Sequence, residues 1–283
     1  NNAASQHDHI APRLLDSGWK NTAGTQHITI SGSRRSQIGP FLLHFPRLVD
    51  ESPVEVTCAM CRMLLANRNG IFRLRKILAD IPGCSSLREY LEALELRDGG
   101  NGNGYALLGE DGEVRMAKGV SLSPAEAARA METEQYAWVL FHSREASEGS
   151  ISDRNCHPFS VEGRHSATGK ATSRLVFAAN GNEAALAPLA RAWGDITDSE
   201  FIGRMVVDMG LPLMETLCCF ESNFFGFADG VPFVKKGNRD MLLFRDEDAL
   251  VFASDFPFAM KGLMKPPQNY CWTFPEDPTM CCK

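Results

Sequence analysis

The sequence predicts an α+β protein in which antiparallel sheets pack against helices. Continuous apolar runs, which are typical of strands buried on both faces, occur at 137–141 and 175–178. Helical patterns follow near 183–193 and 198–209, and strand patterns then resume. Because strands and helices come in blocks, without a regular β–α–β alternation, antiparallel sheets are favoured over a doubly wound parallel fold.

The predicted globular part begins with a strand directly after Cys61, where a short apolar stretch starts. Apolar and basic residues recur with helical periodicity at 73–79, which predicts a helix that ends at Pro82-Gly83. The next helix has Ser85 or Ser86 as its cap, because serine side chains accept a hydrogen bond from the first turn.

Glycine and polar residues fill the run at 98–104. This run has no strand before it and no helix after it, as a phosphate-binding loop would, so we interpret it as a flexible loop that is too polar for the core. Asp111-Gly112 predicts a hairpin turn between strands at 105–108 and 113–116.

A strong helix start lies at Ser123, where proline follows the cap and Glu126 stands three residues after it. The helix is expected to reach about 134. Further strands are predicted at 224–228, 241–245 and 250–253, with a turn at 229–230.

The composition is that of an ordinary globular protein, with 44% hydrophobic and 23% charged residues. A net charge of -6 argues against nucleic acid or an anionic membrane as the main partner. The sequence contains no long apolar span and opens without a signal-peptide pattern, so we expect a cytoplasmic protein. The nine cysteines are irregularly spaced, which favours reduced thiols over a disulfide scaffold.

Residues 1–60 are rich in Ser, His, Asn and Gln and differ from the remainder. We interpret them as an N-terminal extension, propeptide or vector-derived leader ahead of a domain at 61–283. A weak alternation at 27–30 predicts a short strand. The pair His7 and His9 is more simply explained as exposed in a flexible terminus than as a metal site.

Cys61 lies in the run Met60-Cys61-Arg62, which resembles the start of a protein. If the chain is cut before Cys61, or starts at Met60 with the methionine removed, one residue carries both a thiol and an α-amine, a nucleophile with its own base. The spacing of Cys58 and Cys61 also suggests a zinc or redox pair. No second such pair follows at a finger-like distance, so no metal is expected. Cys58 is the weaker nucleophile candidate because no apolar strand follows it.

Three further features end strands or open helices, where side chains can converge. Arg144 follows a buried strand, Asn180-Gly181 follows another, and Asp198 stands at a helix start. Taken singly, each has a simple explanation: a surface arginine, a turn and a helix cap.

Taken together with Cys61, these features resemble the class II glutamine amidotransferases, which are N-terminal-nucleophile hydrolases. The segment 142–159 is similar to the family's signature loop, and the Met-Cys-Arg opening is similar to its stand-alone subgroup. The motifs occur in the family's order from about Cys61 to Pro257. The resemblance implies a four-layer αββα sandwich of two antiparallel sheets between helices.

The resemblance also implies catalytic roles. Cys61 would attack the side-chain amide and form a γ-glutamyl thioester, with its own α-amine as the base. The side chain of Asn180 and the backbone N–H of Gly181 would form the oxyanion hole. Many relatives have histidine before this pair, whereas this chain has Ala179, a change expected to alter support rather than the donors.

Three residues would act on the substrate side. Arg144 would hold the α-carboxylate, a bidentate task that suits arginine. Asp198 would pair with the α-ammonium. His157 would order the signature loop next to the substrate rather than act as a base.

The function that follows is hydrolysis of the side-chain amide of glutamine or of a γ-glutamyl compound, without a cofactor. Ammonia would pass to a separate synthase subunit, or a small γ-glutamyl amide would simply be hydrolysed, and an oligomer is compatible with the sequence. The alternative is a catalytically silent regulatory or assembly subunit, because a peptide bond caps Cys61 in this chain. A third candidate, an N-terminal-nucleophile acylase or peptidase, fits less well because Arg144 and Asp198 match the two charges of a free amino acid.

Overall fold

The computed structural model describes residues 61–146, 149–163, 172–194, 196–258, 260–275 and 279–280. The proposed extension at 1–60, its expected strand at 27–30, the histidines near the N-terminus and Cys58 lie outside these residues.

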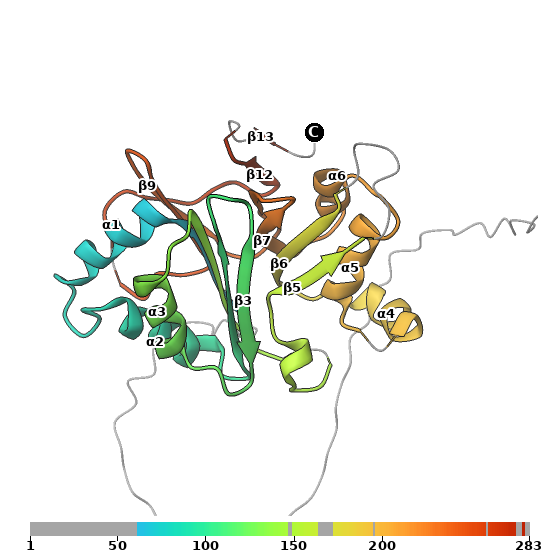
Figure 1. The fold of residues 1–283 in the computed structure, drawn as a ribbon, viewed down its shortest axis with the longest axis horizontal. Coiled ribbons are helices and arrows are strands. Elements are labelled where there is room, and N and C mark those ends of the chain that lie inside the picture. The colour runs from blue at the N-terminus through green and yellow to red at the C-terminus, as the bar shows by residue number, and fades with distance from the viewer. Residues whose placement is uncertain are drawn as a thin grey trace, which may run out of the picture. The chain divides into compact units, whose positions relative to one another are not determined.

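Two antiparallel sheets form the centre of the fold (Figure 1). The seven-stranded sheet has the order β11 (Leu263–Met264), β9 (Leu242–Asp246), β10 (Ala249–Ala253), β1 (Arg62–Asn67), β4 (Trp138–Ser143), β2 (Asn103–Leu108) and β3 (Val114–Gly119). The six-stranded sheet has the order β13 (Thr279–Met280), β12 (Tyr270–Thr273), β8 (Val231–Lys235), β7 (Asn223–Ala228), β6 (Arg174–Asn180) and β5 (Phe159–Glu162).

Helices cover the outer face of each sheet, as Figure 1 shows. The seven-stranded sheet carries α1 (Arg68–Leu78), α2 (Leu87–Asp98) and α3 (Pro124–Thr133). The six-stranded sheet carries α5 (Asp198–Val207) and α6 (Leu213–Cys218), and α4 (Ala187–Gly194) packs against α5. Two short 3-10 turns, η1 (Asp153–Asn155) and η2 (Ala184–Leu186), complete the described elements. The predicted α+β sandwich of four layers, αββα, is confirmed.

Three hydrophobic clusters separate the four layers. In β1, Leu64 and Ala66 face the helices, whereas Met63 and Leu65 face the other sheet. The alternating sides of β6 likewise join the inter-sheet cluster and the cluster beneath α5. Strands buried on both faces need apolar residues at every position, which explains why β4 and β6 read as continuous apolar runs.

Most predicted elements are present with shifted ends. Asn67 caps α1, which therefore starts earlier than its apolar–basic rhythm indicated, and Ser86 is the cap of α2. The capping box of Ser123 and Glu126 is formed as expected. The turn at 229–230 leads into β8, a strand that the sequence analysis missed because Pro232 interrupts its pattern.

The prediction that 98–104 is a flexible loop outside the core was wrong. Gly102 to Gly104 is buried, and β2 begins within this run. The backbone of Arg144 pairs with it, since Asn101 N–H donates to Arg144 C=O and Arg144 N–H donates to Gly102 C=O. A Cβ at Gly104 would lie 2.0 Å from the carbonyl oxygen of His157. Glycine is needed here because two backbones meet closely.

Cysteine oxidation differs in part from the expectation of reduced thiols. Cys271 is disulfide-bonded, so the expectation is wrong at this position. Cys61, Cys84, Cys156 and Cys219 are free thiols. Within the described part of the chain, no helix is long and apolar enough to cross a membrane.

Candidate active site

Five of the six residues singled out in the sequence border one small cavity of about 30 Å³: Cys61, Arg144, His157, Gly181 and Asp198. They come from segments that are far apart in the chain. The sixth, Asn180, is the buried last residue of β6, directly before Gly181. The sheets bring these segments together because β1 and β4 of one sheet contact β6 of the other.

Cys61 precedes β1, and its position relative to Arg144 follows from strand register. Arg62 in β1 pairs with Ser143 in β4, so the residues flanking this pair lie side by side. The Cys61 Sγ lies 3.3 Å from both the backbone nitrogen and the carbonyl oxygen of Glu145. Burial raises the pKa of the Cys61 thiol to about 11, although the Glu145 backbone and the Arg144 charge oppose this. The thiol is therefore neutral at neutral pH and needs a base to become a nucleophile.

Two buried histidines lie beside this cavity. His157 Nδ1 is 2.9 Å from Nε2 of His142, which is part of β4, so one ring donates a hydrogen bond to the other. Burial lowers the pKa of His142 to about 3 and the pKa of His157 well below its usual value. Neither imidazole is thus suited to hold the Cys61 proton at neutral pH. The pair instead connects β4 to the segment that leads into β5. His142 is the first residue of the segment 142–159, and the sequence pattern predicted no role for it.

Arg144 is buried, with 4% of its surface exposed, although it directly follows a strand end. Its Nη1 donates to the carbonyl oxygen of Ser150 at 3.0 Å. Asn155 Nδ2 donates to the same oxygen at 3.1 Å. The loop that follows β4 is therefore folded back around the arginine, and the guanidinium is held at the cavity.

Gly181 adopts a backbone conformation that only glycine accepts easily, with φ +148°. A Cβ at this position would lie 2.3 Å from Ser222 Oγ and 2.8 Å from Ser222 Cα. The loop that carries Ser222 is therefore packed directly against Gly181.

Asp198 is the first residue of α5, and Thr197, not Asp198, caps this helix. The carboxylate is buried and accepts hydrogen bonds from two backbone N–H groups, at 2.7 Å from Glu183 and at 2.8 Å from Ser199. A helix N-terminus stabilises negative charge. The Asp198 side chain is thus held at the edge of the cavity.

Glu183 is a residue that the sequence analysis missed. Its Oε1 accepts hydrogen bonds from Glu221 N–H at 2.9 Å and from Ser222 N–H and Oγ at 2.9 and 2.7 Å. Its own N–H donates to Asp198 Oδ2. These partners are separated by up to 39 residues, so no local pattern indicated them.

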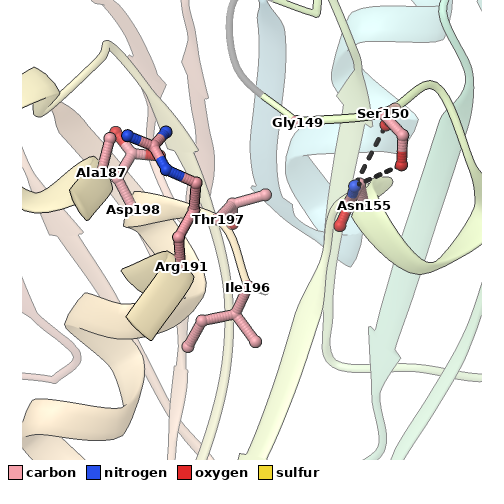
Figure 2. Close-up of a pocket in the computed structure, with 8 residues that line it drawn as sticks. All are labelled: Gly149, Ser150, Asn155, Ala187, Arg191, Ile196, Thr197 and Asp198. Carbon is pink, nitrogen blue, oxygen red and sulfur yellow. Dashed lines mark hydrogen bonds between the residues drawn. The ribbon is translucent and has the colours of Figure 1, made fainter. Parts of the chain in front are cut away.

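A second cavity of about 160 Å³ adjoins the first and shares Asn155, Thr197 and Asp198 with it. Figure 2 shows Asn155 on one wall and Ile196, Thr197 and Arg191 on the facing wall. The small cavity at the thiol and the larger cavity thus share part of one wall. No group of three or more His, Cys, Asp or Glu side chains suited to a metal ion occurs among the described residues.

Comparison with known proteins supports the fold. No protein family model matches the chain, and no curated protein does. Among solved structures, glutamine phosphoribosylpyrophosphate amidotransferase from B. subtilis, complexed with ADP and GMP, is 15% identical with a TM-score of 0.50, covering 78% of this chain and 49% of its own. The allosteric regulatory enzyme of purine biosynthesis is 15% identical with a TM-score of 0.54, covering 79% and 49%. The chain has the N-terminal-nucleophile hydrolase fold.

A third structure, a glutamine aminotransferase class-II domain protein from Silicibacter pomeroyi, is 15% identical and covers 77% of this chain and 97% of its own, with a TM-score of 0.45. The chain spans about half the length of the first two structures. At this level of identity, the similarity defines the fold and leaves the chemistry to the site itself.

Proposed function

We propose that the chain is a glutamine amidohydrolase of the class II amidotransferase type, with Cys61 as nucleophile. The observation that carries the proposal is the convergence of Cys61, Arg144, Gly181 and Asp198 on one cavity. Amide hydrolysis needs a nucleophile, an oxyanion donor and a grip on the charged end of the substrate. The cavity offers a candidate for each. One structural neighbour, the glutamine phosphoribosylpyrophosphate amidotransferase from B. subtilis, has a name that agrees with this substrate class.

In the proposed mechanism, the α-amine of a mature N-terminal Cys61 takes the thiol proton as sulfur attacks the side-chain carbonyl carbon of glutamine. The oxyanion accepts hydrogen bonds from Asn180 Nδ2 and Gly181 N–H. The protonated amine then gives its proton to the leaving nitrogen, the C–N bond of the tetrahedral intermediate breaks, and ammonia departs to leave a γ-glutamyl thioester on Cys61. Water hydrolyses the thioester to glutamate and restores the thiol.

Substrate recognition in this proposal uses the two charges of a free amino acid. Arg144 holds the α-carboxylate and Asp198 the α-ammonium. The ammonia serves a separate synthase subunit, as in a stand-alone amidotransferase, or a small γ-glutamyl amide is the physiological substrate. No cofactor is needed for either reaction.

The test is to place a protease site ending immediately before Cys61 in the full chain and to cleave it after folding. Ammonia and glutamate release from glutamine is then measured before and after cleavage. Activity should appear only after cleavage, because the amide nitrogen of an uncut chain is no base. The Cys61→Ala variant should be inactive, and Cys84→Ala, which removes another buried thiol, should remain active. Absence of turnover by cleaved chain on glutamine and on a panel of γ-glutamyl amides would refute the proposal.

A second candidate function is a catalytically silent regulatory or assembly subunit. The raised pKa of the Cys61 thiol favours it for any chain whose Cys61 nitrogen is capped, because the neighbouring histidines cannot supply a base. Intact-mass analysis of protein from its native source separates the two functions. Retention of residues 1–60 on every molecule supports the silent subunit, whereas an N-terminal Cys61 supports the enzyme.

A further inference from the structure

The loop at 220–222 is held by opposite charges from two sides. One carboxylate oxygen of Glu183 accepts hydrogen bonds from the N–H groups of Glu221 and Ser222. Lys235, which is fully buried, donates from Nζ to the carbonyl oxygens of Phe220 and Ser222. An anion on the N–H groups and a cation on the carbonyl groups both favour one conformation of this loop.

The held loop lies directly against Gly181, since a Cβ there would be 2.8 Å from Ser222 Cα. Gly181 is therefore confined on this side by Ser222. A further glycine, Gly237, also packs closely against the loop, because its Cβ position would lie 1.8 Å from the carbonyl oxygen of Glu221. The direction of the Gly181 N–H thus depends on how firmly the loop is held.

Glu183 also contacts a second segment of the chain, through its backbone. Its backbone N–H donates to Asp198 Oδ2 at 2.7 Å, which is among the shortest contacts of that carboxylate. The position of this N–H depends on the side chain of Glu183, because the three hydrogen bonds to Oε1 anchor the residue. One residue is therefore linked both to the Gly181 segment and to Asp198.

We propose that Glu183 is a positioning residue that sets the oxyanion donor at Gly181 and the ammonium-binding carboxylate of Asp198 together. The proposal rests on the function proposed above. It predicts that loss of the Glu183 side chain weakens transition-state stabilisation and α-ammonium recognition at once. Glu183 itself touches neither the substrate nor the reacting atoms.

The kinetic test compares Glu183→Ala, Glu183→Gln and Glu221→Ala in chain cleaved before Cys61. Glu221 lies in the same loop, and its carboxylate accepts a hydrogen bond from Asn238 Nδ2 rather than from the groups that bind Glu183, so it is the matched control. Glu183→Ala should lower kcat about tenfold, a part of the loss expected when an oxyanion donor is removed. Glu183→Gln should recover most of the rate, because its amide oxygen can accept the same three hydrogen bonds.

The substrate comparison separates positioning from general damage. Glu183→Ala should also raise KM for glutamine about tenfold, as expected for a weakened charged hydrogen bond. For 4-carbamoylbutanoate, the analogue without the α-amine, KM should change little, because Asp198 has no ammonium to bind. Equal changes for both substrates, or equal effects of Glu183→Ala and Glu221→Ala, would overturn the proposal.

A measurement on the full chain does not depend on catalysis. Hydrogen–deuterium exchange should be faster in Glu183→Ala at the amides of Glu183, Ser199 and Ser222, and unchanged at these amides in Glu221→Ala. If cleaved wild-type chain proves inactive, the proposed function fails, and this exchange pattern still decides whether Glu183 holds both segments. Unchanged protection at Glu183 and Ser199 in Glu183→Ala would refute the coupling.

Discussion

The two sheets supply the candidate active site by different means. The seven-stranded sheet provides Cys61 and Arg144, whose neighbourhood follows from the pairing of β1 with β4. The six-stranded sheet provides Asn180, the last residue of β6, and Gly181, which follows the ladder and packs against the Ser222 loop. The first half is thus set by backbone register and the second by loop contacts. Substitutions in loops should therefore damage the second half selectively.

The largest effect is expected from Gly181→Ala. The added Cβ would meet Ser222 at 2.3 Å, and the backbone conformation at φ +148° disfavours any side chain. The proposed oxyanion N–H would be displaced, so kcat should fall by about 10²–10³-fold. Glutamine hydrolysis by cleaved chain is the measurement.

The control for that experiment is alkylation of Cys61 by iodoacetamide, which reports on the other half of the site. Its rate should stay near that of the wild type in Gly181→Ala, because β1 and β4 are unaffected. A large change in alkylation would show that the two halves are not independent.

The second prediction concerns the histidine pair that joins the halves. His142 and His157 have pKa values lowered by burial, so the unfolded chain binds more protons below about pH 6.5. The free energy of unfolding is therefore highest above this pH and decreases as the pH falls. At pH 5 the decrease is about 2 kcal/mol for each imidazole. Urea unfolding at pH 7, 6 and 5 measures this loss.

The comparison is with His157→Phe, which removes one of the two imidazoles that take up a proton when the chain unfolds. Its loss of stability between pH 7 and pH 5 should be smaller than in wild type by about 2 kcal/mol. The difference in slope is informative even if the variant is less stable at every pH. Identical slopes would mean that folding does not lower the pKa of His157 and would contradict the prediction.

The smallest effect is expected on the first half, from Gly104→Ala. The Cβ would lie 2.0 Å from the His157 carbonyl oxygen and 2.8 Å from Lys118 Cβ, so β2 and the His157 segment must move apart. Overpacking of this kind costs about 1–3 kcal/mol. Thermal unfolding should show the loss, and Gly100→Ala offers a check on glycine removal near by, because nothing lies within 4 Å of its Cβ position. Alanine at position 100 is itself strained, because φ there is +90°. The packing argument is therefore supported only if Gly104→Ala loses more thermal stability than Gly100→Ala.

The sequence predicts those parts of the fold where local pattern and burial agree. The runs that became β4 and β6 are apolar at every position, because clusters lie on both their faces. The capping box at Ser123 is equally local. The short strand β5 and the proline-containing β8 were missed, because their residues become strand-like only through pairing with β6 and β7.

The same distinction applies to the site. Arg144, Gly181 and Asp198 could be named because each follows a strand or begins a helix. Glu183 could not, since its partner Ser222 is 39 residues away and the contact exists only after β6 and β7 have paired. Burial of 102–104 was missed for a related reason, as a glycine-rich run does not reveal which backbone will pack against it.

The pairing of β1 on both sides has a consequence for how such a chain would be switched on. Ladder pairing with β4 starts at Arg62, and β10 pairs along the other edge of the strand. Cutting the bond before Cys61 would break no hydrogen bond of the ladder and would turn one amide into an amine. Under the proposed function, the uncut chain would be a zymogen whose active site is already assembled. Activation would convert the Cys61 nitrogen from an amide, which cannot accept the thiol proton, into an amine, which can. The sheet would not rearrange.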